Sequence, residues 1–136
     1  MKTPRQINDE RERSGFPRLN FKLFRRVIRQ LETHPEMYDQ DTYETNTDCG
    51  SVRCIGGWGA YFSHIPIWKK GSVQFKQIAK AFGIVEYEAT VLFSGSTVLW
   101  PEKYRLQWNR ATSGKEETRV AIRYLTHIIK TGKVTE

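Results

Sequence analysis

The most distinctive part of this 136-residue chain is the stretch Cys49-Gly50-Ser51-Val52-Arg53-Cys54-Ile55-Gly56-Gly57-Trp58-Gly59-Ala60-Tyr61-Phe62. It contains both cysteines, and from Ser51 onward it predicts a helix that has Ser51 or Gly50 near its N-cap. The apolar residues of this helix mark a buried side: Val52, Ile55, Trp58, Gly59 and Phe62. A glycine inside a helix costs roughly 1 kcal/mol relative to alanine, so three glycines indicate a close approach to the backbone. Either another helix or a ligand makes that approach.

A second amphipathic helix is predicted to begin after Asn20, which is a good N-cap residue. Its apolar residues recur at spacings of three and four and define one face: Phe21, Phe24, Val27, Ile28 and Leu31. The opposite face is basic and consists of Arg18, Lys22, Arg25, Arg26 and Arg29. This basic face is either a solvated surface or a contact surface for phosphate groups or an acidic partner. The helix ends at His34-Pro35, because the residue before a proline avoids the α region.

The rest of the sequence divides into a predicted N-terminal arm and a predicted domain. Residues 1–17 are polar and charged and predict a flexible N-terminal arm, and residues 18–136 are predicted to form a single helical domain. Residues 36–48 are acidic and predict an ordered loop, since their aromatic side chains need cover. Short helices are predicted at residues 73–82 and at about 85–93.

Two more helices complete the predicted fold. One opens at Trp100-Pro101, and the last begins with the capping box Ser113-x-x-Glu116 and ends at Gly132. No segment shows the period of two that is typical of strands. The chain is therefore predicted to be mainly α, a compact single-domain bundle of five or six helices around the central glycine-containing helix.

Composition and charge limit the setting of the protein. Its hydrophobic content of 38% argues against disorder, and no apolar run approaches the roughly 18 residues of a membrane span. The N-terminus has no apolar signal region, so a cytosolic protein without a membrane role is expected. A net charge of +7 favours anionic partners, such as nucleic acid, a nucleotide or an acidic protein surface.

The two cysteines do not match a redox or metal motif. Cys49 and Cys54 are five residues apart, which is the wrong spacing for C-x-x-C chemistry. Together with His34 and His64 they match no zinc-ligand pattern. Cys49 is a candidate nucleophile with a histidine as its base, but a free cysteine among apolar residues usually serves packing. We therefore predict no catalytic residue, no metal ligand and no cofactor.

The start of the glycine-containing helix is a candidate anion site. The cluster Gly56-Gly57-x-Gly59 is not a phosphate loop, because it lacks a preceding strand and a Lys-Ser or Lys-Thr pair. The amides at the start of the predicted helix, next to Arg53, would nevertheless hold an anion. The predicted ligand-binding residues are Gly50, Ser51, Arg53 and Trp58.

A weak helix-turn-helix pattern lies further along the chain, in Ile78-Ala79-x-x-x-Gly83-Ile84 followed by Ala89 and Leu92. A DNA-reading helix would contact bases through its first residues, which here are Glu86, Tyr87 and Glu88. Two carboxylates are unfavourable against DNA phosphates. The alternative is a helical hairpin that serves packing alone.

The motif Cys49-Gly50-Ser51-x-x-Cys54-Ile55-Gly56-Gly57-Trp58 resembles the Cys-Gly-Ser/Thr-x-x-Cys-Ile-Ala-Gly-Trp signature of a family of small, uncharacterised proteins from bacteria and their phages. The similarity continues through Ala79-x-x-x-Gly83-Ile84, Leu92-Phe93, Trp100-Pro101 and Thr131-Gly132, and it covers roughly residues 34–133. Gly56 replaces the usual alanine. The resemblance implies a phage or bacterial cytosolic setting, which for a phage protein is the host cytoplasm, and it implies no activity.

These observations predict a non-enzymatic, phage-associated binding protein. It would bind or inhibit a host protein, or sequester a small anionic ligand. The first alternative is a nucleic-acid-binding protein that uses the basic surface together with the helix-turn-helix-like hairpin. The second alternative is a thiol- or metal-dependent enzyme.

Overall fold

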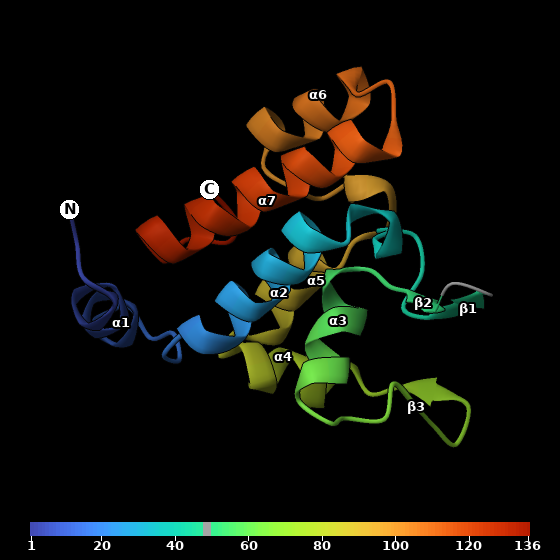
Figure 1. Ribbon diagram of the computed structural model, residues 1–136. Helices are drawn as coiled ribbons and strands as arrows, with labels where there is room; N and C mark the ends of the chain where they lie inside the picture. Colours follow the sequence, from blue (N-terminus) through green and yellow to red (C-terminus); the bar gives the residue numbers. More distant parts are fainter. Residues whose placement is uncertain (48–49) are drawn as a thin grey trace.

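The computed structural model describes residues 1–47 and 50–136, and for residues 45–47 and 50–52 it describes the backbone alone. In this part of the chain seven α-helices pack into a bundle, which confirms the mainly α class (Figure 1). The helices are α1 (Pro4–Arg13), α2 (Phe21–Thr33), α3 (Ile55–Phe62), α4 (Phe75–Phe82), α5 (Glu86–Leu92), α6 (Glu102–Arg110) and α7 (Gly114–Thr131). Two 3-10 turns complete the helical segments: η1 (Pro35–Met37) follows α2, and η2 (Gly95–Thr97) lies between α5 and α6.

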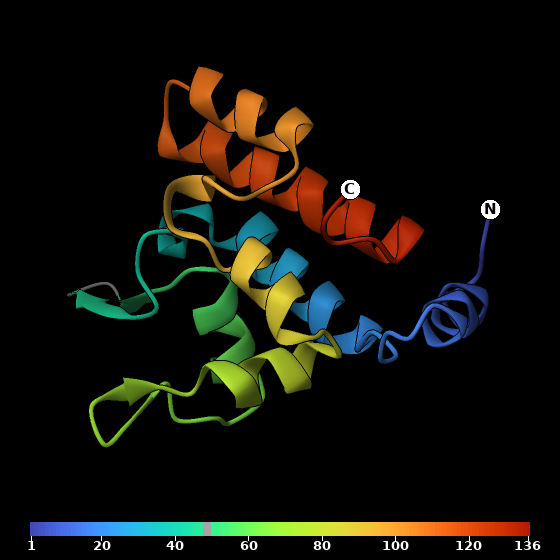
Figure 2. The same ribbon diagram turned by 180° about the vertical axis from the view of Figure 1, so that it is seen from behind.

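The core forms where α2 passes between its neighbours. Helix α2 packs against α7 on one side and against α3 and α4 on the other. Its buried residues Phe24, Val27 and Leu31 share one hydrophobic core with the buried face of α7, which consists of Val120, Ala121, Tyr124, Leu125 and Ile128. Helix α1 lies at one end of the bundle, and the hairpins lie at the opposite end (Figure 1 and, from behind, Figure 2).

Several predicted helix ends are confirmed. The side chain of Asn20 caps α2 by accepting a hydrogen bond of 3.1 Å from the amide of Leu23. The Ser113 hydroxyl accepts one of 3.2 Å from the amide of Glu116. The Glu116 carboxylate, in turn, accepts from the amide of Thr112, one residue before the cap. Gly132 ends α7 with a left-handed φ of 74°.

The start of α3 differs from the prediction. Residues Gly50–Val52 form strand β2, which pairs antiparallel with β1 (Thr45–Thr47), so the helix begins at Ile55. Its N-cap is Cys54, whose sulfur accepts a hydrogen bond of 3.3 Å from the amide of Gly57. A second hairpin pairs β3 (Trp68–Lys69) with β4 (Ser72–Val73). Strands of two or three residues are too short to show a period of two, which explains why no strand was predicted.

The N-terminal segment also differs from the expectation of a flexible arm. Thr3 and Gln6 form a capping box, with hydrogen bonds of 3.1 Å and 2.8 Å, and Pro4 occupies the first turn of α1. Ile7, Asn8 and Arg11 of this helix are buried against the bundle. The segment folds because one side of this highly charged helix carries residues that are buried against the rest of the chain.

The glycines of α3 are explained by packing within the chain. A side chain at Gly57 would overlap with the backbone carbonyl of Tyr43, and one at Gly59 would overlap with the ring of Phe82. A Cβ at Gly56 would lie 3.1 Å from Tyr43 and 3.2 Å from Phe93. Other segments of the protein, not an open ligand pocket, therefore occupy the space beside these glycines.

Candidate functional site

Four cations form the basic face of α2: Lys22, Arg25, Arg26 and Arg29. All four are exposed, and among the described residues none takes part in an ion pair. The guanidinium of Arg26 lies over the ring of Phe62, 4.5 Å from its centre, and that of Arg25 lies 5.4 Å from the ring centre of Phe21. These contacts hold the arginine side chains on the surface without neutralising them.

Arg18 was predicted on the same face but lies before the helix. Its guanidinium pairs with the carboxylates of Asp9, at 3.0 Å, and Glu12. Hydrogen bonds with Glu12 and Asp9 raise the pKa of Arg18 above its ordinary value. Its charge is therefore balanced by α1, and Arg18 is not part of the basic face of α2.

A groove runs between the basic face of α2 and helix α7. Its volume is about 500 Å³, and it is lined by Arg25, Arg26, Ile28, Arg29, Glu32, Thr126 and Ile129. Ile28 and Ile129 are only partly buried. The groove therefore combines cations with apolar side chains, and it also contains one carboxylate.

The predicted anion site is not assembled as expected. Gly50 and Ser51 belong to strand β2 rather than to a helix start, and Cys49 lies outside the described residues. The structure does bring Arg53 and Trp58 together, with the guanidinium 5.5 Å from the Trp58 ring centre. However, a Glu44 oxygen lies 2.6 Å from Nη2 of Arg53 and balances its charge. This ion pair makes a simple anion a poor ligand for Arg53.

Arg53 instead forms part of the wall of an aromatic cleft, which we define by Glu44, Arg53, Tyr61, His64 and Trp68. The cleft has a volume of about 460 Å³, and Ala60, Ile65, Pro66 and Ile67 complete its lining. Tyr61 and Trp68 are 54% and 56% exposed, which is unusual for large aromatic rings. A second cavity of about 260 Å³ shares Arg53 and Tyr61 with this cleft, and its other lining residues are Gln30, His34, Met37 and Trp58.

The side chain of Arg53 is 9% exposed, and its Nε atom has no hydrogen-bond partner among the described residues. The flat guanidinium lies over Tyr61, 4.8 Å from the ring centre. Arg53 thus orders the aromatic residues around it and presents its paired charge at the edge of the cleft.

Cys54 does not have the properties of a nucleophile. Its side chain is buried, and burial raises the pKa of the thiol to about 11. The thiol is therefore protonated at neutral pH, whereas the thiolate is the reactive form. Among residues 1–47 and 50–136 no group of three or more His, Cys, Asp or Glu side chains gathers as metal ligands do.

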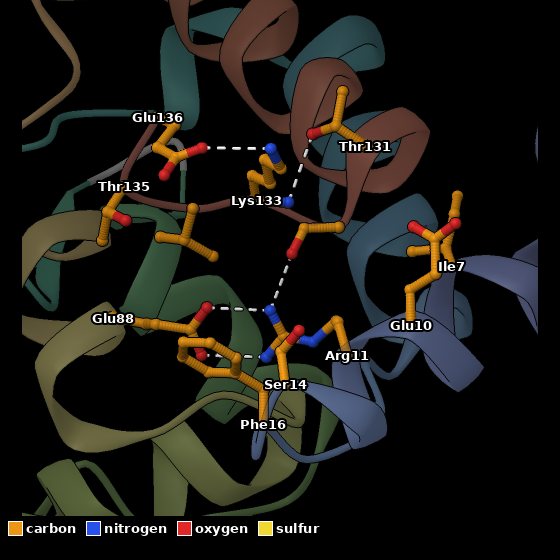
Figure 3. A pocket seen from close by; sticks show the side chains of 12 residues that line it. Ile7, Glu10, Arg11, Ser14, Phe16, Glu88, Thr131, Lys133, Thr135 and Glu136 are labelled. Carbon is orange, nitrogen blue, oxygen red and sulfur yellow. Dashed lines mark hydrogen bonds and ion pairs between the residues drawn. The ribbon is translucent and has the colours of Figure 1, made fainter.

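Sequence reasoning missed the pair Arg11 and Glu88, which lies beside a cavity of about 310 Å³ (Figure 3). Nη1 and Nη2 of Arg11 each donate to a Glu88 oxygen at 2.8 Å. Arg11 also donates to the carbonyls of Pro17, Gly83 and Gly132. These bonds use the donor capacity of the guanidinium, so Arg11 serves the structure rather than a ligand. The two residues are 77 positions apart, and no local pattern connects them.

The segment that carries the helix-turn-helix-like pattern folds as two helices, α4 and α5, joined at Gly83 with a left-handed φ of 75°. Ala79 and Ala89 are both buried in the core. At the start of α5, Glu88 faces Arg11 inside the protein, while Glu86 remains exposed. DNA reading by this hairpin stays a prediction.

Comparisons of the chain with protein-family models, with curated proteins and with solved structures gave no match. The resemblance to small phage and bacterial proteins therefore stays a prediction. In the part of the chain that the structure describes, no helix has both the length and the apolar character required to cross a bilayer.

Proposed function

We propose that this chain is a non-enzymatic binding protein that holds an acidic segment of another protein on the basic face of α2. In the setting that the sequence resemblance implies, the protein is phage-associated and its partner is a host protein. The observation that carries the proposal is the set of four exposed cations, Lys22, Arg25, Arg26 and Arg29, without ion-pair partners among the described residues. Such a charge cluster attracts an acidic partner and orients it.

The groove beside the basic face favours a protein over nucleic acid. Ile28 and Ile129 offer apolar surface there, and Glu32 would repel phosphates. A short acidic helix with leucines on one face fits this chemistry, because its leucines would cover the isoleucines while its carboxylates reach Arg25 and Arg29. A nucleic-acid backbone has no comparable apolar side chains.

The proposal is tested by fluorescence anisotropy with a labelled amphipathic peptide. Its leucines recur at helical spacing on one face, and its glutamates occupy the other face. The wild type is compared with the double variant Arg25→Glu with Arg29→Glu. The matched control is Lys80→Glu with Lys115→Glu, which makes the same charge change at exposed positions of α4 and α7. We expect the first double variant to bind at least about 10-fold more weakly and the control to bind like the wild type. Equal affinities in the two double variants would show that the basic face of α2 does not bind the acidic partner.

The salt dependence of duplex DNA binding distinguishes the nucleic-acid alternative from the proposed acidic protein partner. Binding of duplex DNA releases counterions, so its affinity falls with salt in proportion to the number of phosphates contacted. We expect weak duplex binding whose affinity does not exceed that of the acidic peptide at moderate salt. Tight duplex binding that Arg25→Glu with Arg29→Glu abolishes would replace the protein partner by DNA.

A further inference from the structure

We propose that the aromatic cleft binds the base of a nucleotide, either free or within a single strand. This inference goes beyond the proposed function, because it concerns a different site and a different ligand. It depends on two exposed rings, on the ion pair that lines the same cleft and on the cations of the nearby hairpin.

Tyr61 is a fixed ring with an available surface. The Arg53 guanidinium lies over it at 4.8 Å, and the ring of Trp58 meets it edge-on, with centres 5.6 Å apart. The Phe62 ring lies 5.4 Å away. These neighbours order Tyr61, yet 54% of its surface remains exposed. A ring that is already ordered loses little entropy when a base stacks on it.

Trp68 is held by the second hairpin. It pairs with Val73 across the two strands, and the amide of Gln74 donates to the carbonyl of Ile67 at 2.8 Å. The turn residues Lys70 and Gly71 both have positive φ, 52° and 78°, as in a tight two-residue hairpin turn. The hairpin therefore fixes the backbone of Trp68, while 56% of the surface of this residue remains exposed to solvent.

The polar edge of the cleft selects the kind of planar ligand. The ion pair of Arg53 and Glu44 lines the cleft, and the Glu44 side chain, which is 32% exposed, offers acceptor oxygens to an amino group of a base. A base presents donors and acceptors along one edge of a flat ring, whereas a simple anion would meet the Glu44 carboxylate. A purely apolar ring would leave the ion pair without a ligand contact.

The surrounding charge favours a ligand that carries phosphate. Lys69 and Lys70 are exposed at the tip of the hairpin that holds Trp68. In addition, the ring of Phe62 contacts that of Tyr61, and the guanidinium of Arg26 lies 4.5 Å from the Phe62 ring centre. Cations next to stacking rings are the features that proteins use to bind single strands and nucleotides.

The test uses the full-length protein and two probes. Isothermal titration calorimetry measures binding of AMP and GMP, and fluorescence anisotropy measures binding of a short labelled oligodeoxyadenylate. We expect Trp68→Ala to weaken binding about 10-fold and Trp68→Phe to restore most of it, because base stacking requires a ring. The matched control is Tyr87→Ala, which removes an exposed ring of α5 that does not line the cleft. Circular dichroism checks that each variant is folded.

Each outcome has a defined meaning. Binding of AMP or GMP that Trp68→Ala weakens supports a site for free nucleotides, and binding of the oligonucleotide alone with the same loss supports a single-strand site. No binding of either probe to the wild type at millimolar concentration would overturn the proposal. It would also be overturned if Trp68→Ala bound the probes as tightly as Tyr87→Ala. Mononucleotide binding that is unchanged by Arg25→Glu with Arg29→Glu keeps this test separate from that of the acidic partner.

Discussion

The side chains of Arg11 and Glu88 form a buried ion pair that joins the first helix of the protein to α5. Two hydrogen bonds of 2.8 Å connect them, and the two side chains are 5% and 3% exposed. Glu88 also accepts a hydrogen bond of 3.1 Å from the amide of Val85, at the start of its own helix. One carboxylate thus caps α5 and holds α1 in place.

We expect Glu88→Gln to lower the free energy of unfolding by about 3–5 kcal/mol, because it leaves the charge of Arg11 buried and unpaired. Urea unfolding followed by circular dichroism measures this change. The double variant Arg11→Met with Glu88→Leu removes both charges and should be less destabilised than Glu88→Gln. Lys2→Ala is the control, since it breaks an exposed pair with Glu10 and should change stability by less than about 1 kcal/mol. A loss of that small size in Glu88→Gln would show that the buried pair does not stabilise the fold.

The glycines of α3 are expected to resist substitution for a steric reason. At Gly57 the obstacle is the backbone carbonyl of Tyr43, which cannot move by a rotamer change, and at Gly59 it is the Phe82 ring. Gly57→Ala should therefore destabilise the protein by about 1–3 kcal/mol and by more than Gly59→Ala, although alanine favours a helix. Gly114→Ala is the control, because no atom of the described residues lies within 4 Å of its added methyl group. Thermal melts that rank Gly59→Ala below Gly57→Ala in stability would contradict this order.

The ends of α2 and α7 show what the sequence could predict. Asn20, Ser113 and Gly132 act locally, through hydrogen bonds and backbone angles within a few residues, so their roles follow from residue type and spacing. The apolar stripes of both helices face the core for the same reason.

The start of α3 and the arrangement of the candidate sites depend on contacts between distant residues. Ser51 is a good N-cap by type, yet its segment pairs with Thr45–Thr47 and the cap passes to Cys54. Arg11 and Glu88 are ordinary surface charges by local pattern, and only the fold places them together. Likewise, nothing in the spacing of Tyr61 and Trp68 indicates that a turn and a hairpin bring them to one cleft.

The helix caps lead to a comparison between two similar substitutions. Asn20→Ala removes the cap of α2 and also the hydrogen bond of 2.9 Å that the side-chain Nδ2 of Asn20 donates to the carbonyl of Ala81. Ser113→Ala removes only the cap of α7. We expect a loss of about 1 kcal/mol for Ser113→Ala and a larger loss for Asn20→Ala, measured by urea unfolding. Equal losses would mean that the link between α2 and α4 adds nothing to stability.

Alkaline pH should destabilise the protein through Cys54. Burial raises the pKa of this thiol from 9.0 to about 11 in the folded state. Between pH 9 and pH 11 the unfolded chain releases a proton that the folded protein retains, so stability falls by up to about 1.4 kcal/mol per pH unit in this window. Below pH 9 the thiol is protonated in both states and contributes no dependence. Urea unfolding at pH 8 and pH 10 should show a smaller decrease for Cys54→Ser than for the wild type, and equal decreases would exclude the thiol as the cause.

The turn of the second hairpin provides a way to change the support of Trp68 without touching its ring. Lys70 has a left-handed φ of 52°, which asparagine adopts more readily than lysine. Lys70→Asn should therefore stabilise the protein by up to about 1 kcal/mol, whereas Lys70→Pro should open the hairpin, because proline fixes φ near −65°. Calorimetric titration with adenosine, which carries no phosphate, then separates geometry from charge. Lys70→Asn should bind adenosine like the wild type and Lys70→Pro should bind it more weakly, while equal binding by both variants would show that the hairpin does not hold the stacking ring.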